Sequence, residues 1–229
     1  MLNTLLNTFQ DLSGAICTVA IAVVPAILGI ILHEAAHSYA AFRRGDPTAA
    51  MMGRLTLNPL PHIDPIGILV FALTSLTGFA FGWARPVPVN PLYFRNPARD
   101  MMLVALAGPM INMALALVFG VLLRLAFQFF PLALWQHSGV YIFVLSSLQA
   151  GVVINFGLAW LNLLPVPPLD GGKALACFLP DQTRWRFIQF ERYGFVILLL
   201  LLFTGLLGDM LSPLVRGSVR GLFSILGLQ

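Results

Sequence analysis

One short stretch of the sequence has residue types and a spacing that could bind a metal ion and activate water. It is His33-Glu34-Ala35-Ala36-His37, which lies inside an otherwise apolar segment. On a helix, His33 and His37 are one turn apart and project from the same face, so two neutral imidazoles can hold one Zn²⁺ ion. Glu34, roughly 100° further around the helix, can take a proton from water bound to that ion.

The alternative is that these three residues are incidental polar groups on a buried helix. The chain has only four His and two Glu, so a chance match to this spacing is rare. Ionisable groups at membrane depth also cost free energy, and three of them within five residues call for a partner such as a metal. We therefore interpret His33 and His37 as ligands of one Zn²⁺ per chain and Glu34 as the catalytic base.

The composition is that of an integral membrane protein. Hydrophobic residues make up 59% of the chain, charged residues 10%, and the mean hydropathy is +0.88. A soluble domain would carry about 25% charged residues. The net charge of +4 includes no basic run, so we expect a lipid bilayer around the chain and no nucleic-acid partner. Cys17 and Cys177 are too few and too far apart for a disulfide framework or a thiolate zinc site.

We predict an all-α, multi-pass membrane protein in which residues 1–229 form one membrane-embedded domain. Its core is expected at about 14–175, and a C-terminal membrane helix with an amphipathic tail at 187–229. The bundle would contain about 4–6 membrane segments. The predicted helices are a short interfacial helix at Met1–Ser13, spanning helices at Gly14–Phe42, Asp100–Phe130, Gly139–Leu164 and Phe187–Leu207, and the tail at Ser212–Leu228.

Three stretches do not fit spanning helices. Ile66–Phe81 is apolar but has only 16 residues, fewer than a crossing usually needs. Gly53–Leu57 alternates like a short strand, and the prolines in and after Trp83–Val89 exclude helix there. We expect short extended or β stretches near the active site.

Asp170 is the best candidate for a third metal ligand. A catalytic zinc site has three protein ligands and an open position, and Asp170 is an acidic residue next to a membrane segment in broken, glycine-rich backbone. Such backbone at membrane depth is tolerated only where it is buried in protein or lines a water-filled cavity. The alternative is that Asp170 only caps the turn at Gly171-Gly172.

The ligand assignment constrains the topology. The ends of the helices at 14–42 and 139–164 must lie on the same side of the membrane, which requires Ile66–Phe81 to be a re-entrant hairpin. Most basic residues then face that side and only Arg124 lies near the other, so the positive-inside rule makes the active-site side cytoplasmic. The basic residues on that side are Arg43, Arg44, Arg54, Arg85, Arg95, Arg99, Lys173, Arg184 and Arg186.

Three motifs in order resemble the site-2 proteases, which are intramembrane zinc metalloproteases. They are His33–His37, Ala107-Gly108-Pro109-Met110-Ile111-Asn112, and Asn162-Leu163-Leu164-Pro165-Val166-Pro167-Pro168-Leu169-Asp170-Gly171-Gly172. The resemblance covers roughly Ala26–Lys173. It implies His33, His37 and Asp170 as zinc ligands, Glu34 as catalytic base, and Asn162 as a residue that contacts substrate or the oxyanion. The chain differs from larger members in lacking a peptide-binding (PDZ-type) insertion and in carrying the additional apolar stretch Ile66–Phe81.

Simpler roles remain open for the weaker candidates. Asn162 and Asn112 could bond neighbouring helices, as amides in membrane bundles do. His62 and Asp64 lie in a proline-rich turn, where a local hydrogen-bond network is the alternative to a place near the site. Arg85 fits a lipid-headgroup anchor.

We predict a zinc metalloendopeptidase that hydrolyses a peptide bond in or near a transmembrane segment of a membrane-protein substrate, as in regulated intramembrane proteolysis. The extended stretches could receive the unwound substrate as an added strand. We expect an inner (cell) membrane location. One alternative is a transporter or channel with a midplane metal site, which gives no reason for Glu34 directly after His33. The other is a catalytically silent scaffold of the same fold. The oligomeric state is not readable from the sequence.

Overall fold

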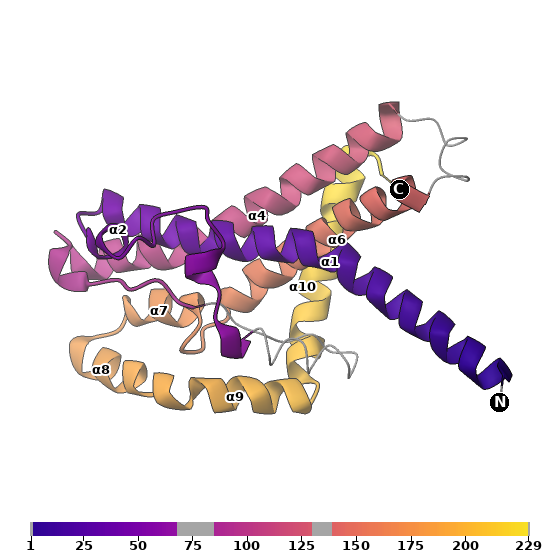
Figure 1. Cartoon of the computed structure of the whole chain (residues 1–229). Coiled ribbons are helices and arrows are strands. Elements are labelled where there is room, and N and C mark those ends of the chain that lie inside the picture. Colours follow the sequence, from indigo (N-terminus) through magenta and orange to yellow (C-terminus); the bar gives the residue numbers. More distant parts are fainter. Residues whose placement is uncertain (1, 68–84, 130–138, 229) are drawn as a thin grey trace.

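The computed structural model describes residues 2–67, 85–129 and 139–228 (Figure 1), and all regular elements among these residues are helical. The long helices are α1 (Leu2–Arg43), α4 (Pro97–Phe129), α6 (Gly139–Asn162) and α10 (Leu206–Leu226). The shorter ones are α2 (Thr48–Met51), η1 (Leu60–His62), η2 (Pro91–Tyr93), α7 (Asp170–Ala176), α8 (Asp181–Gln189) and α9 (Glu191–Phe203).

Three of these helices are long and apolar enough to cross a membrane, namely α1, α4 and α6. A fourth crossing is available if the end of α9 and α10, which meet at a bend of 80°, are taken as one broken span. The all-helical membrane fold is therefore confirmed with three to four candidate spans among the described residues. The predicted helices at 100–130 and 139–164 match α4 and α6 within a few residues.

The N-terminal helix differs from the prediction of two separate pieces. α1 runs without a break from Leu2 to Arg43, through the predicted boundary at Ser13-Gly14. A single glycine inside a helix costs only about 1 kcal/mol relative to alanine and does not end it. Figure 1 shows the N-terminal part of α1 (indigo) projecting away from the other helices.

The C-terminal region also differs in its boundaries from the prediction of a span at Phe187–Leu207 followed by an amphipathic tail at Ser212–Leu228. The apolar run ends at Phe203, and Gly205 adopts a left-handed conformation (φ 79°) from which α10 begins. α10 packs against α6 and α4, and its Leu222 belongs to a core cluster with Ala116, Phe119, Val152 and Phe156. The predicted amphipathic segment is therefore helical but begins six residues earlier, at Leu206 and not at Ser212.

The predicted strand at Gly53–Leu57 is wrong, because this stretch forms a turn and bends with no strand partner among the described residues. Most of Ile66–Phe81 falls within 68–84, outside the described residues, so the re-entrant hairpin stays a prediction. The chain that contains it nevertheless starts and ends at one end of the bundle. Arg44, just after α1, lies 3.6 Å from the carboxylate of Asp100 in the first turn of α4.

Candidate metal centre

The two histidines project from α1 toward α4, at a point where α4 has no side chain. A Cβ added at Gly108 would lie 2.5 Å from Cε1 and 2.6 Å from Nε2 of His33, and would also overlap Nε2 of His37. Both imidazoles are buried, and their Nε2 atoms are 3.0 Å apart. Glycine at 108 therefore makes room for two side chains of α1 to point at one spot.

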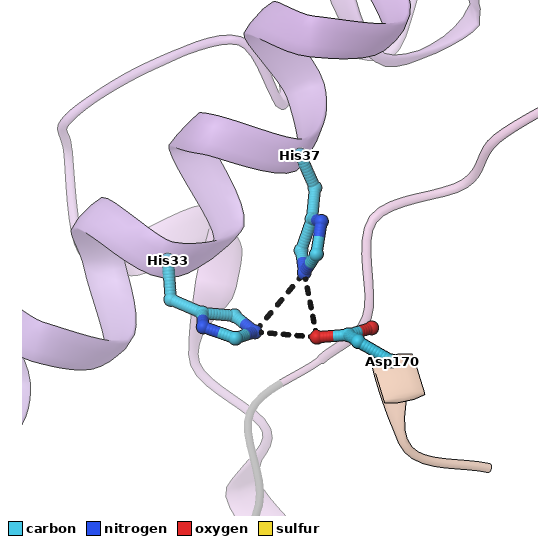
Figure 2. A group of neighbouring side chains, drawn as sticks. All are labelled: His33, His37 and Asp170. Carbon is cyan, nitrogen blue, oxygen red and sulfur yellow. Dashed lines mark hydrogen bonds and ion pairs between the residues drawn. The ribbon is translucent and has the colours of Figure 1, made fainter. Parts of the chain in front are cut away.

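Asp170 comes to the same spot from α7. Its Oδ2 lies 3.0 Å from Nε2 of His33 and 3.1 Å from Nε2 of His37. Figure 2 shows the three side chains pointing toward one another. The prolines at 165, 167 and 168 end the α6 helix and let the chain turn back, so that Asp170 begins α7 beside α1.

Asp170 is buried at 3% exposure, and its second oxygen, Oδ1, accepts a hydrogen bond of 3.2 Å from the Lys173 ammonium one turn further along α7. Burial alone raises the pKa of the Asp170 carboxyl. The positive charge of the Lys173 ammonium acts in the opposite direction and favours the ionised form of the carboxyl. The side chain is therefore a carboxylate, the form in which it can bind a metal.

The outer nitrogen of each imidazole has a protein acceptor. His37 Nδ1 donates to the Val104 carbonyl oxygen at 2.7 Å, because a carbonyl can only accept. His33 Nδ1 lies 2.6 Å from Oδ1 of Asn112, whose amide nitrogen is bonded to Gly29 and Asn155. When neutral, both histidines therefore carry their proton on Nδ1 and present a free lone pair at Nε2, the form that binds a metal ion.

The donor atoms of these three residues suit a metal ion. With both histidines in this neutral form, two Nε2 lone pairs and one carboxylate oxygen, all acceptors, converge within 3.0–3.1 Å of one another. Such a group repels itself unless a cation lies at its centre. The ligand atoms of a tetrahedral zinc ion lie roughly 3.3 Å apart, so the His33, His37 and Asp170 donor set fits zinc.

Glu34 lies beside this group, and its Oε2 accepts a hydrogen bond of 3.2 Å from the Val87 backbone N–H. Val87 belongs to an irregular segment, residues 85–90, which is hydrogen-bonded to the rest of the protein at both ends. The Arg85 N–H donates to the His62 carbonyl at 2.9 Å, and the Asn90 N–H donates to the buried Asp46 carboxylate at 2.7 Å. These two hydrogen bonds fix the position of the Val87 N–H, which in turn orients one oxygen of Glu34.

A cavity of about 550 Å³ opens onto the metal group. Its lining is mostly apolar and includes Ile30, Val87, Val104, Leu161, Leu198 and Leu207. Asn162 also lines it, with one amide N–H donated to the Leu158 carbonyl of its own helix at 2.9 Å. The predicted site residues His33, Glu34, His37, Asp170 and Asn162 thus share one cavity.

His62 and Asp64 are not among the residues that line this cavity. His62 is 1% exposed, and its Nε2 donates to the Thr56 carbonyl at 3.0 Å. Asp64 accepts hydrogen bonds from the N–H groups of Ile66 and Gly67. His62 is linked to the site only indirectly. Its backbone carbonyl accepts the Arg85 N–H of segment 85–90, and Val87 of that segment bonds to Glu34.

Asn112, from the second of the three motifs, bonds to His33, but its buried neighbour Asn155 and the carbonyl of Val104 were not predicted from the sequence. Asn155 is one of the few polar residues in the mostly apolar helix α6, which was a signal available in the sequence. The role of the Val104 carbonyl had no sequence signal, because every residue has a carbonyl group.

Apolar helices that could span a membrane, together with a buried metal-ligand group between them, define an integral membrane metalloprotein. Residues 130–205 match the model of Peptidase family M50. The chain is 38% identical over 213 residues to Putative zinc metalloprotease YwhC of Bacillus subtilis (strain 168), covering 88% of this chain and 90% of the relative. It is 32% identical over 203 residues to Putative zinc metalloprotease Rip2 of Mycobacterium tuberculosis (strain ATCC 25618 / H37Rv), covering 89% of this chain and 73% of the relative. No solved structure matches the chain.

The chain therefore belongs to peptidase family M50, the site-2 proteases, as the three motifs predicted. It is a membrane metalloprotease whose cofactor is zinc.

Proposed function

We propose that this protein is an intramembrane zinc endopeptidase of the His-Glu-x-x-His type, which cleaves membrane-protein substrates in or near a transmembrane segment. Such cleavage would serve regulated intramembrane proteolysis. The observation that carries the proposal is the convergence of His33, His37 and Asp170 between membrane helices, beside Glu34 and at the wall of an apolar cavity.

In this proposal His33, His37 and Asp170 hold the zinc ion. A zinc ion in such a site supplies Lewis-acid chemistry and makes water acidic enough to lose a proton near neutral pH. Glu34 is the general base, with Oε2 held by the Val87 N–H and its other oxygen left to take the proton. The same carboxyl then returns the proton to the leaving amine.

Asn162 would stabilise the oxyanion of the scissile carbonyl. Only one of its two amide N–H groups needs to donate to Leu158, which leaves the other for the oxyanion. Its position in the wall of the cavity supports this role.

The substrate would lie in an unwound conformation along segment 85–90. In this segment Pro86 and Pro88 have no N–H, and the N–H groups of Arg85, Val87 and Asn90 already have acceptors. The segment therefore offers carbonyl oxygens and the Val89 N–H, so the substrate must supply most of the donors. The apolar lining of the cavity suits side chains from a transmembrane segment.

We further propose that the protein lies in the cell (inner) membrane with the metal centre toward the cytoplasm. The support is the distribution of basic residues, which collect at the end of the bundle where α1 ends and α4 begins.

The experiment that tests the proposal compares wild type with Glu34→Gln for zinc content and for cleavage of a model transmembrane peptide. Gln keeps the shape of the side chain but cannot act as a base, so turnover should fall by about 10²–10⁴-fold with zinc retained. Asp64→Asn is the matched carboxylate-to-amide control and should cleave like wild type. Turnover by Glu34→Gln close to wild type would rule out Glu34 as the base.

A further inference from the structure

Three helices meet behind His33 at a pair of buried amides. Asn112 of α4 and Asn155 of α6 are both 0% exposed, and Asn112 Nδ2 donates to Oδ1 of Asn155 at 3.0 Å. The same Nδ2 donates to the Gly29 carbonyl of α1 at 3.2 Å. The space is tight, because a Cβ at Gly29 would lie 2.5 Å from Oδ1 of Asn155.

Backbone carbonyls fix the orientation of both amides. Asn155 Nδ2 donates to the Gly151 carbonyl at 2.9 Å, which turns Oδ1 of Asn155 toward Asn112. Asn112 must then turn its nitrogen toward Asn155 and its oxygen toward His33. The result is one chain of hydrogen bonds that runs from His33 Nδ1 through Asn112 and Asn155 to α6, with every donor pointing away from the metal centre.

Such a chain has two effects on His33. It holds the imidazole proton on Nδ1, so Nε2 keeps its lone pair, and successive hydrogen bonds polarise one another in the same direction. Partners of this kind raise the basicity of a ligand imidazole and fix the orientation of its ring. His37 depends instead on a single backbone carbonyl, that of Val104.

We propose that Asn155 is a positioning residue for the zinc centre, which acts on His33 only through Asn112. The inference rests on the proposed role of His33 as a zinc ligand and goes beyond it. Removal of the Asn155 carboxamide leaves one buried N–H of Asn112 without an acceptor. That unpaired donor favours orientations of Asn112 that no longer present Oδ1 to His33.

The test is a double-mutant cycle on zinc affinity with the full-length protein in detergent, measured by competition with a chromogenic chelator. Asn112→Leu should weaken zinc binding by about 10–100-fold, and Asn155→Leu by about 10-fold. The double variant should bind zinc no more weakly than Asn112→Leu alone, because Asn155 has no other route to the metal. Cobalt substituted for zinc should show a changed visible spectrum in both single variants.

Val152→Ala is the matched control, since Val152 is equally buried and lies one turn before Asn155 on the same helix. It should lower thermal stability without changing zinc affinity or the cobalt spectrum. If Asn155→Leu does not fold, Asn155→Asp and Asn155→Ala replace it. A neutral Asp carboxyl keeps both hydrogen bonds and should bind zinc within about threefold of wild type, whereas Ala should be weaker.

Two results would overturn the inference while leaving the zinc centre intact. One is a wild-type zinc affinity in Asn155→Leu or Asn155→Ala. The other is a double variant whose loss of affinity equals the product of the two single losses, which would mean that Asn155 and Asn112 act independently. A wild type that binds no more zinc than Asp170→Ala would instead overturn the proposed zinc site, and this inference with it.

Discussion

At the metal centre, the proton positions on His33 and His37 explain why three acceptors can converge. Each neutral imidazole donates its Nδ1–H to a buried acceptor, so both Nε2 lone pairs face the Asp170 carboxylate. The cost of bringing these groups together in a buried site is recovered only when a cation binds. Loss of any one ligand should therefore affect zinc binding more than it affects folding.

We expect His33→Ala, His37→Ala and Asp170→Ala each to lower bound zinc from about one per chain to less than about a tenth, and to reduce peptide hydrolysis by at least about 100-fold. Metal analysis of the purified proteins measures the first effect. Asp209→Ala removes an exposed carboxylate of α10 and is the control, with zinc content expected to stay at the wild-type level. Full zinc occupancy in Asp170→Ala would remove Asp170 from the ligand set.

The chemistry of the site could be predicted from the sequence only where a motif carried it. His33, Glu34, His37 and Asp170 were found because metal binding demands particular residue types at particular spacings. Asn155 was missed because the few polar residues of α6 do not gather on one face, and periodicity then does not say which face meets α4. Which amide faces which histidine is decided by the rotation of packed helices, and that depends on the whole bundle.

At the scale of the helices, the site depends on how closely α4 approaches α1. The absence of a side chain at Gly108 lets both imidazoles lie against the α4 backbone. Lipid gives helices no hydrophobic reason to associate, so close contact at small residues matters more than in water. Gly108 is thus required both for helix packing and for the placement of the ligands.

Gly108→Ala should disrupt the metal centre although it removes no ligand. Its Cβ would overlap both Nε2 atoms, so either the imidazoles or α4 must move, at a cost of about 1–3 kcal/mol in stability. We expect zinc affinity to fall by more than about 10-fold, measured by chelator competition.

Gly157→Ala on α6 is the matched control, because a Cβ at that position meets nothing within 4 Å. It should keep zinc and activity, with stability unchanged or higher by up to about 1 kcal/mol. Wild-type zinc affinity in Gly108→Ala would mean that the helices can separate without loss of the site.

Helices were predictable where length and apolar content decided them, as for α4 and α6. The C-terminal region was harder because one left-handed glycine, Gly205, divides an apolar run that composition alone reads as continuous. The stripe of Val215, Val219, Leu222 and Leu226 at helical spacing was visible in the sequence and indicates a packed face. Alternation over five residues at 53–57 was too short to predict a strand, because a strand also needs a partner to pair with.

At the scale of the whole molecule, the positions of the proposed metal ligands and the contacts between helices indicate the same membrane topology. The C-terminal ends of α1 and α6 must lie on the side that holds the metal centre. His37 is near the end of α1, and Asp170 follows the end of α6. The contact between Arg44 and Asp100 places the start of α4 on that side as well. Residues 45–96 therefore leave and return on one side, and an apolar stretch within them that enters the bilayer must also leave on that side.

This arrangement predicts the labelling of single cysteines in a background without Cys17 and Cys177. Leu60 and Leu92 are 72% and 91% exposed and flank the apolar stretch on either side. Leu60→Cys and Leu92→Cys should both react with an impermeant thiol reagent only from the cytoplasmic face. His137→Cys, in the sequence between α4 and α6, should react only from the opposite face. Retained zinc content in each variant verifies that the fold is intact.

The three positions together separate orientation from topology. If each of the three cysteines reacts from the face opposite to the one predicted, the topology stands but the orientation is reversed. The positive-inside argument then fails, and the metal centre faces away from the cytoplasm. If Leu60→Cys and Leu92→Cys react from opposite faces, the stretch between them crosses the membrane. The end of α1 and the start of α4 would then lie on opposite sides. That result is incompatible with the contact between Arg44 and Asp100, and a His33, His37 and Asp170 centre would need Asp170 to return through the bilayer.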